Sequence, residues 1–374
     1  MRLICSIVLS LVCSFVFSQS NFFNPGKQWK DTNGVHINAH GGGMLFVDGA
    51  YYWYGEYKTS GRGGNTSLKG ISCYSSKDLY NWKNEGIVLK VEQDHNSEIT
   101  KGCVMERPKV VFNKKTGKYI MWFHLELKGQ GYDAARAAVA ISDTPNGPFK
   151  FKKSYRPNKG VWPINFDDKF KSASSDESAL KSWTPEWREA IKNGMFIRRD
   201  FDKGQMSRDM TVYVDDNDKA YLIHASEDNL TLHISELIDD YLDFTEKWTR
   251  VAPADHNEAP AVFKKGGVYY MITSGCTGWD PNEARSFKSK SIWGPWESLG
   301  NPCIGKDASL TFHSQSTYIL SVEGKKDQFI FMADRWKPDN PIDGSYIWLP
   351  ITITDEKPIL KWFDKWSLLD FKEN

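Results

Sequence analysis

Residues 256–275 read HNEAPAVFKKGGVYYMITSG, and they contain the pattern that decides the fold. A short apolar strand begins near Pro260, a Lys-Lys-Gly-Gly turn follows, and a second strand rich in tyrosine comes after it. β-Branched and aromatic residues suit a half-buried pleated surface. The two glycines permit the positive φ that a tight turn needs. We therefore predict a β-hairpin over 260–275, with the carboxylate of Glu258 placed just ahead of it.

Similar hairpins recur along the chain. After most of them comes a polar bend and a further strand that carries an aromatic residue, as in SKDLYNWKNEGIVL and SKSIWGPWESLG. Most hairpins begin roughly 50 to 65 residues after the preceding one, and a four-stranded unit repeated at that period is typical of a propeller blade. The sequence therefore predicts an all-β protein, a five-bladed β-propeller. The other four hairpins are 43–58, 108–126, 209–226 and 316–336.

One segment, about 155–200, breaks the period-two pattern, and we predict a short helix within it from about Pro185 to Asn193. Leaving it out restores the spacing between hairpins, so we interpret it as a partly helical insertion and not as a domain. Insertions in repeat proteins gather on loops, often of the binding face. Trp162, Trp183 and Trp187 either cap a substrate groove or pack within a surface excursion.

The bulk composition limits the classes of function. The chain has 374 residues, 40% of them hydrophobic, which is enough for a large core. Its formal net charge of +1 gives no electrostatic basis for binding nucleic acid or an anionic membrane. Cys73, Cys103, Cys276 and Cys303 are too few and too scattered for a disulfide framework, although one or two bridges or free buried thiols both remain open.

The first residues resemble a secretory signal. Arg2 precedes an apolar run, and Val16-Phe17-Ser18 suits cleavage before Gln19. We therefore expect a signal peptide over 1–18, one catalytic domain over 19–374, and export to the periplasm or the medium. A lipoprotein is the weaker alternative, because Ser-Leu-Val is a poor lipobox before Cys13. No later segment is apolar enough to span a bilayer.

Polar side chains stand at or just before the inner strand of four predicted blades. Because blades converge on a central axis, residues at the same end of these strands point toward a shared funnel. The expected group is Glu106, Asp209, Glu258 and Gln315. The first blade has INAH at this place, without an acid.

Other chemistries fit less well. Gly41-Gly42-Gly43 is similar to a lipase oxyanion loop, but no G-x-S-x-G accompanies it. His36 and His40 lie on a strand pattern and not on a helix, where one turn would bring the two rings together as metal ligands. The aspartates near 215–218 lack the spacing of a calcium loop. We therefore predict no metal site and no cofactor.

The phrases HINAHGGGM, YWYGEYK, MERPKVVF, SEDN, NEAPAVF, TSGCTGW, SQSTYIL and ADRW occur in an order and spacing that resemble glycoside hydrolase family 43, and its exo-β-1,3-galactanase group in particular. The resemblance covers the mature chain except 155–200. It implies that Glu258 is the general acid and that Glu106 orients it and adjusts its pKa. Gln315 would hold or activate the water, because the first-blade aspartate of the family is missing here. It also implies that Glu56, Asp209 and Thr277 contact the terminal galactose.

The function so implied is release of terminal galactose from β-1,3-linked galactan with inversion, on an oligosaccharide or polysaccharide substrate. Trp279 and Trp336 are candidate sugar platforms, or else core residues. Inversion would place the acid and its counterpart roughly 6.5–9.5 Å apart. Burial and a neighbouring ionised Glu106 would raise the pKa of Glu258. Alternatives are a β-galactofuranosidase, an α-L-arabinofuranosidase, or a propeller that binds glycans without cleaving them.

Overall fold

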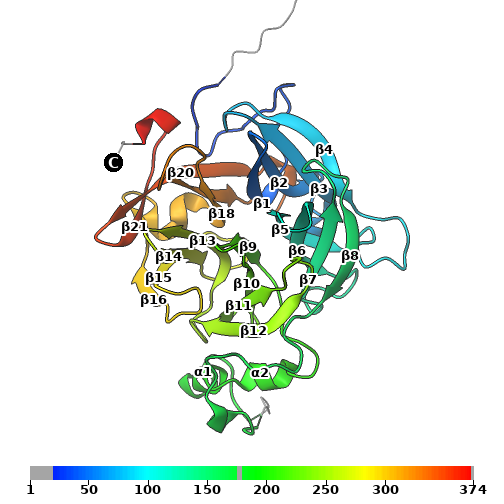
Figure 1. Ribbon diagram of the computed structural model, residues 1–374, viewed down its shortest axis with the longest axis vertical. Helices are drawn as coiled ribbons and strands as arrows, with labels where there is room; N and C mark the ends of the chain where they lie inside the picture. The colour runs from blue at the N-terminus through cyan, green and yellow to red at the C-terminus, as the bar shows by residue number, and fades with distance from the viewer. Residues whose placement is uncertain (1–19, 175–178, 372–374) are drawn as a thin grey trace, which may run out of the picture.

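Each of the five predicted hairpins forms the inner two strands of one β-sheet. The computed structural model describes residues 20–174 and 179–371, and its five sheets radiate from a common centre (Figure 1). The predicted five-bladed β-propeller is therefore confirmed. The signal peptide expected over 1–18 lies outside the described residues.

The first three blades each have four antiparallel strands in sequence order. Blade 1 contains β1 (His40–Val47), β2 (Ala50–Lys58), β3 (Leu68–Ser76) and β4 (Lys83–Lys90). Blade 2 contains β5 (Val104–Asn113), β6 (Lys118–Glu126), β7 (Arg136–Ser142) and β8 (Lys150–Tyr155). Blade 3 contains β9 (Met210–Val214), β10 (Ala220–Ser226), β11 (Thr231–Leu237) and β12 (Phe244–Val251).

The last two blades complete the ring. Blade 4 contains β13 (Glu258–Lys265), β14 (Val268–Ser274), β15 (Ala284–Ser289) and β16 (Glu297–Gly300). Blade 5 contains β18 (Gln315–Ser321), β19 (Phe329–Arg335), β20 (Ser345–Thr354) and β21 (Lys357–Lys361), and the short β17 (Cys303–Ile304) pairs in parallel with β21. Single 3-10 turns lie at Gly64–Thr66, Asp168–Phe170, Ala308–His313, Pro341–Asp343 and Leu368–Asp370.

The innermost strands are β1, β5, β9, β13 and β18, and each packs against its neighbour around the axis, including β18 against β1. The ring is closed near the ends of the described chain, where Phe23 and Trp366 form a β-bridge. As a result, residues at the heads of these five strands meet despite long separations in sequence.

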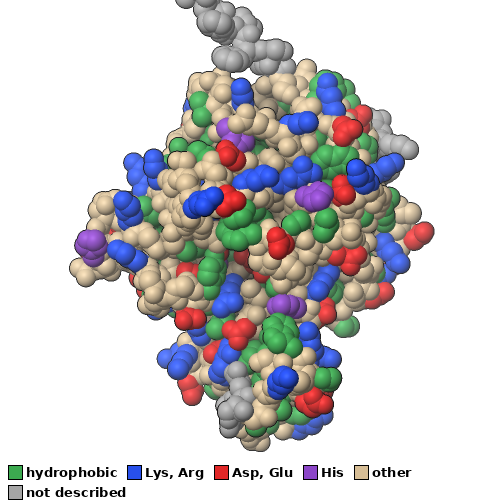
Figure 2. Space-filling view, turned by 180° about the vertical axis from the view of Figure 1, so that it is seen from behind, with side chains coloured by type: hydrophobic (Ala, Val, Ile, Leu, Met, Phe, Trp, Pro, Cys, Tyr) green, Lys and Arg blue, Asp and Glu red, His purple; other side chains and the backbone are tan. Residues whose placement is uncertain are grey.

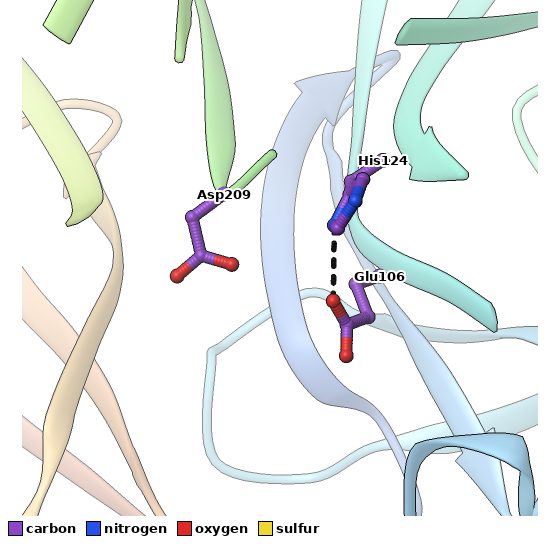
Figure 3. Close-up of side chains that lie close together, drawn as sticks. All are labelled: Glu106, His124 and Asp209. Atoms are coloured by element: carbon purple, nitrogen blue, oxygen red, sulfur yellow. Dashed lines mark hydrogen bonds and ion pairs between the residues drawn. The ribbon is translucent and has the colours of Figure 1, made fainter. Parts of the chain in front are cut away.

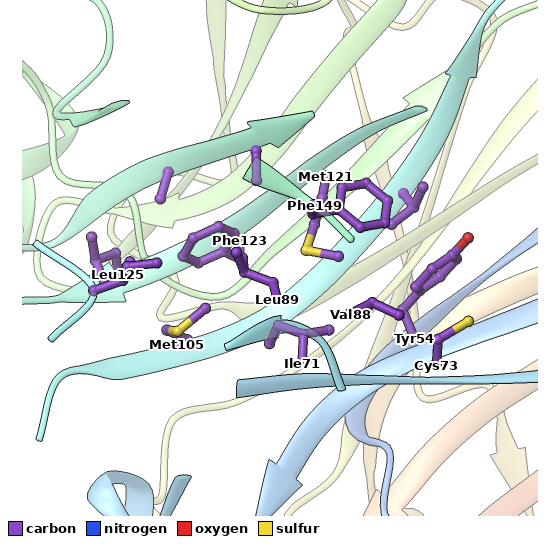
Figure 4. Close-up of a cluster of buried hydrophobic side chains, with 14 of the residues drawn as sticks. Tyr54, Ile71, Cys73, Val88, Leu89, Met105, Met121, Phe123, Leu125 and Phe149 are labelled. Carbon is purple, nitrogen blue, oxygen red and sulfur yellow. The ribbon is translucent and has the colours of Figure 1, made fainter. Parts of the chain in front are cut away.

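The hydrophobic core lies between blades, where facing sheets pack their side chains together. Figure 4 shows the cluster between blades 1 and 2, which includes Tyr54, Met105 and Phe123. The cluster between blades 5 and 1 contains many aromatic rings, among them Trp53 and Trp348 with centroids 4.9 Å apart. Most of the aromatic residues therefore stabilise the ring of blades, because large buried rings contribute the most transfer free energy per side chain.

The insertion contains α1 (Pro185–Lys192) and α2 (Met195–Asp200), and it lies below β12 in the view of Figure 1. Thr184 caps α1 by accepting a hydrogen bond from the Trp187 backbone N–H, and Pro185 occupies the first turn, where it costs no hydrogen bond. Trp187 is buried and Trp162 packs on Phe201, so of the three insertion tryptophans only Trp183 is exposed.

The described part of the chain has free cysteines and a surface of mixed charge. Cys73, Cys103, Cys276 and Cys303 are all free thiols. Among the described residues, no helix has the length and apolar character needed to cross a membrane. Figure 2 shows acidic and basic side chains interspersed over one face, which agrees with a net charge of only +1.

Candidate active site

A β-bulge at the head of the inner strand directs the polar side chains of three blades toward the axis. The register shifts after His40 in β1, after Glu106 in β5 and after Glu258 in β13. The residue that follows each of them has a positive φ: Gly41 at 62°, Arg107 at 55° and Ala259 at 52°. Bulges re-aim side chains, and a non-glycine residue in this region is strained and common at functional sites.

The first residues of the inner strands surround a cavity of about 250 Å³. That volume lies below the ~300–1,000 Å³ of sites for drug-sized ligands, and it suits a single sugar ring. A larger depression of about 550 Å³, near residues 20–37 and 79–82, contains none of the predicted site residues. Of the eight predicted site residues, seven line the smaller cavity: Glu56, Glu106, Asp209, Glu258, Trp279, Gln315 and Trp336.

Thr277 is the predicted site residue that the structure does not place at the cavity. Its side chain is exposed, its hydroxyl donates to the carbonyl of Asp280 at 2.6 Å, and it accepts from Asn282 at 2.7 Å. The threonine closes the turn that carries Trp279, which does line the cavity. It therefore acts on this site only through the loop.

Glu258 is placed for acid catalysis. Burial and then the negative charge of Asp209 raise the pKa of Glu258 to about 8, against the opposing charge of Arg107 and hydrogen bonds from Cys276 and Gln315. A carboxyl group with this pKa holds its proton at neutral pH. Sequence reasoning attributed the raised pKa partly to Glu106, whereas in the structure the charge that raises it is that of Asp209.

Glu106 has the opposite character. Burial alone would favour its neutral form, but hydrogen bonds and charge from His124, with Lys58 and the Tyr132 hydroxyl, lower the pKa of Glu106 to about 2. Figure 3 shows the His124 ring against this carboxylate, with 3.0 Å between Nδ1 and Oε2. The cavity therefore presents one protonated and one ionised glutamate, a separation of pKa values that assigns acid and anion roles.

Glu106, His124 and Asp209 also offer atoms within 4.8 Å of one another, close enough to be considered for a metal ion. The second nitrogen of His124 lies 2.8 Å from Glu126 Oε1. Burial opposes charging of the ring, yet the two glutamates outweigh it and raise the pKa of His124 to about 9. A protonated imidazole donates from both nitrogens and has no lone pair for a metal. We therefore describe the group as an ion-pair network.

Arg107 was not among the residues predicted for the site, yet it joins these parts. Its guanidinium donates to Asp209 Oδ2 at 2.8 Å, to Gln315 Oε1 at 2.5 Å and to the Ser316 carbonyl at 2.8 Å. It also lies 5.3 Å from the ring centre of Trp336. A single buried cation thus fixes three blades around the cavity.

The position of Gln315 differs from the expectation for an inverting pair. Its Nε2 donates to Glu258 Oε1 at 2.8 Å and to Ser274 at 2.9 Å, so no water fits between the amide and the acid. The expected 6.5–9.5 Å separation is therefore wrong for these two side chains as the structure has them. The physical reason is that β13 and β18 are adjacent inner strands, whose first residues converge.

Glu56 forms the floor of the cavity. Its Oε2 lies 2.5 Å from Lys58 Nζ, and Oε1 accepts from the Arg107 backbone N–H at 3.1 Å. Burial raises the pKa of Glu56, while Lys58 opposes the rise. A side chain at Gly41 would meet Glu56 Oε1 at 2.2 Å, which explains why a glycine with φ of 62° stands there.

Trp279 and Trp336 form one wall of the cavity, with ring centroids 5.9 Å apart and nearly perpendicular planes. Trp279 is 37% exposed, so its ring is not a core residue. The other lining residues were not predicted: most lie on loops without a periodic signal, while Arg107 lies inside β5 and His124 inside β6. They are Asn65, His124, Tyr132, Arg208, Asn229 and Gly278, in addition to Arg107.

Comparison with known proteins places this site in a family. The profile of glycosyl hydrolases family 43 matches residues 173–348. The solved structure of BT3683, described as a family 43 β-1,3-galactosidase with galactodeoxynojirimycin, is 56% identical, covers 92% of this chain and 100% of that one, and has a TM-score of 0.90. The exo-β-1,3-galactanase from Clostridium thermocellum is 35% identical over 93% of this chain and 67% of that one, with a TM-score of 0.75.

A curated relative, named xylosidase/arabinosidase, from Bacteroides ovatus is 30% identical over 152 residues, which is 39% of this chain and 43% of the relative. The similarity to BT3683 extends over that whole chain, and the predicted family and enzyme class are confirmed by it. The chain belongs to glycoside hydrolase family 43 and is a glycoside hydrolase.

Proposed function

We propose that this protein removes terminal galactose from β-1,3-linked galactan, such as an arabinogalactan backbone, with Glu258 as the general acid. The observation that carries the proposal is a buried carboxyl group, Glu258, with a pKa raised to about 8, in a cavity sized for one sugar ring and beside the ionised carboxylate of Glu106. The chain is similar to solved structures named as a β-1,3-galactosidase and an exo-β-1,3-galactanase, and these names support the choice of sugar and linkage.

Glu258 would protonate the glycosidic oxygen as the bond to the sugar breaks. The transition state then resembles an oxocarbenium ion, and the ionised Glu106 would stabilise its positive charge. Asp209 keeps the proton on Glu258 until the leaving oxygen takes it. Trp279 would stack on the apolar face of the galactose, and Trp336, whose ring is nearly perpendicular to it, would contact the edge of the sugar. Glu56 would accept from the sugar hydroxyl groups.

We assign an inverting course, with Gln315 as the holder of the attacking water. When the leaving oxygen occupies Glu258, it takes the place of the Gln315 amide at Oε1. The released Gln315 side chain would then turn away from Glu258 and orient a water on the opposite face of the sugar, as inversion requires. A neutral amide is a poor base, so Gln315 would position the water while the ionised carboxylate of Glu106 would receive the proton.

A furanosidase is the second candidate, and the name of the curated relative from Bacteroides ovatus favours it. Incubation with β-1,3-galactan, aryl β-galactofuranoside and aryl α-L-arabinofuranoside, followed by chromatography of released monosaccharide, separates the candidates. We expect galactose from the galactan. Proton NMR of the first-formed anomer is expected to show α-galactose; an initial β-anomer would exclude inversion, and release from a furanoside alone would exclude the galactanase assignment.

Export is also part of the proposal, because the composition of residues 1–18 is that of a signal peptide. The mature protein is expected to begin at Gln19. Mass spectrometry of the N-terminal peptide, recovered from the periplasm or the medium of the producing cell, tests this. Full-length protein that retains Met1 in the cytoplasm would contradict it.

A further inference from the structure

The hairpin between β10 and β11 turns through an unusual backbone conformation. Glu227, Asp228 and Asn229 have φ values of 52°, 56° and 64°, so three consecutive non-glycine residues are left-handed. The Leu230 N–H closes the turn by bonding the carbonyls of Ser226 and Glu227 at 3.1 Å each. L-Residues avoid this region, and a run of three persists only where surrounding contacts hold it.

Arg250, near the end of β12, supplies the strongest of these contacts. Its Nε and Nη2 donate to the two oxygens of Glu227 at 2.8 and 2.7 Å, a bidentate pair with a carboxylate that is fully buried. His233 lies 2.9 Å from the same carboxylate. Only an arginine offers this planar fork.

The same guanidinium reaches the insertion. Nη1 donates to the Lys192 carbonyl and Nη2 to the Ile191 carbonyl, both at 2.8 Å. These carbonyls belong to the last turn of α1, where the helix has few N–H groups left to donate, although the Ile191 carbonyl also accepts from the Gly194 N–H at 2.8 Å. From α2, Arg199 pairs with Asp228 at 2.8 Å. The helix α1 is therefore linked to the left-handed turn through Arg250, and α2 contacts the turn directly through Arg199.

The turn presents Asn229 to the acid. Asn229 Nδ2 donates to Glu258 Oε2 at 3.2 Å, while Gln315 holds the other oxygen of the same carboxyl group at 2.8 Å. The Cys276 thiol lies 3.6 Å from the Asn229 carbonyl. The carboxyl group of Glu258 is thus held between amides from blades 3 and 5.

We infer that the insertion is a brace for catalysis: through Arg250 and Arg199 it holds the turn Glu227–Asn229 left-handed, so that Asn229 positions the carboxyl group of Glu258. The inference rests on the proposed role of Glu258 as the general acid. Arg250 and Asn229 are positioning residues in this scheme. In this scheme the insertion contributes to catalysis although neither of its helices lines the cavity.

The test uses the pH dependence of kcat/KM on β-1,3-galactan. The charged and titratable groups that act on Glu258 are Asp209, Arg107 and Cys276, all outside the turn. An amide N–H donor favours the ionised acid. Asn229→Leu, similar in shape and unable to donate, is therefore expected to move the alkaline limb upward by roughly 0.5 to 1 pH unit, the equivalent of one neutral hydrogen bond. Arg250→Lys should move it in the same direction.

The two changes are expected to be non-additive, because both remove one contact. Arg136→Lys, at an arginine–glutamate pair in blade 2, is the matched control and should leave the profile unchanged. If the alkaline limb of Asn229→Leu did not shift, the inference would be overturned. If the limb shifted in Asn229→Leu but not in Arg250→Lys, Asn229 would position Glu258 without support from Arg250 and the insertion. If Arg250→Lys does not fold, Asp228→Asn carries the same test. Full activity of Glu258→Gln would instead remove the proposed function.

Discussion

Glu258→Gln is expected to lower kcat on β-1,3-galactan by at least about 10²-fold, since a positioned general acid contributes roughly 10² to 10⁴ in rate. The amide has the same shape but carries no proton that it can give to a leaving alkoxide. The measurement is the initial rate of galactose release. Glu283→Gln, at an exposed glutamate in blade 4, is the matched control and should retain the wild-type rate.

The pH profile gives the same prediction a second readout. Because the pKa of Glu258 is raised to about 8, the acid stays protonated below that pH and loses its proton as pH rises through it. The kcat/KM of the wild type should therefore be level below about pH 8 and fall tenfold per unit above it, whereas Glu258→Gln should lack this limb.

The basicity of the leaving group decides how much the reaction depends on general-acid catalysis. An aryl galactoside with a nitrophenolate leaving group departs without protonation, so Glu258→Gln should lose far less rate on it than on galactan. Equal losses on both substrates would mean that the carboxyl group serves binding or folding and not proton transfer.

The propeller could be predicted from the sequence because its signals are local. Each hairpin carries its own alternation and turn glycines, as at Gly266 and Gly267, and the repeat multiplies a weak signal. The convergence of Glu106, Asp209, Glu258 and Gln315 on one cavity followed from the topology alone.

Arg107 was missed for a physical reason. In a regular strand, neighbouring residues point to opposite faces, so Glu106 and Arg107 should not share a site. The bulge breaks that rule, because Arg107 adopts φ of 55° and both side chains then line the cavity. Period-two reasoning has no means of placing such a bulge when the residue is not a glycine.

A raised pKa for Glu258 and an ionised Glu106 were expected from the sequence, but the charged groups that set these pKa values were not, since they depend on which side chains the fold brings nearest to each acid. Glu106 meets His124, which comes from the next strand of its own blade. Glu258 instead faces Asp209 from blade 3, and burial, followed by the charge of this acid, raises the pKa of Glu258. Two glutamates in matching local sequence settings therefore acquire opposite protonation.

Arg107→Met should produce the largest loss of stability among the site variants. The guanidinium is buried, and its removal leaves Asp209 without its 2.8 Å partner and the Ser316 carbonyl without its donor. Removing one member of a buried ion pair costs about 3–5 kcal/mol, because the remaining charge stays in a medium of low dielectric constant. Denaturant unfolding is expected to show a decrease of that size in the free energy of unfolding.

The same variant should also change catalysis. Arg107 opposes the rise in the pKa of Glu258, so its loss moves the alkaline limb to higher pH while kcat/KM falls, because Gln315 and Asp209 lose the contact that fixes them. Arg107→Lys keeps the charge but not the fork, and should fall between the variant and the wild type in both measurements. Arg62→Met, at an arginine whose side chain is 87% exposed, should change neither. If Arg107→Met unfolded with the same free energy as Arg62→Met, Arg107 would not be the group that joins the three blades at the cavity. The positions of Glu258 and Glu106 would then depend on the inner strands alone.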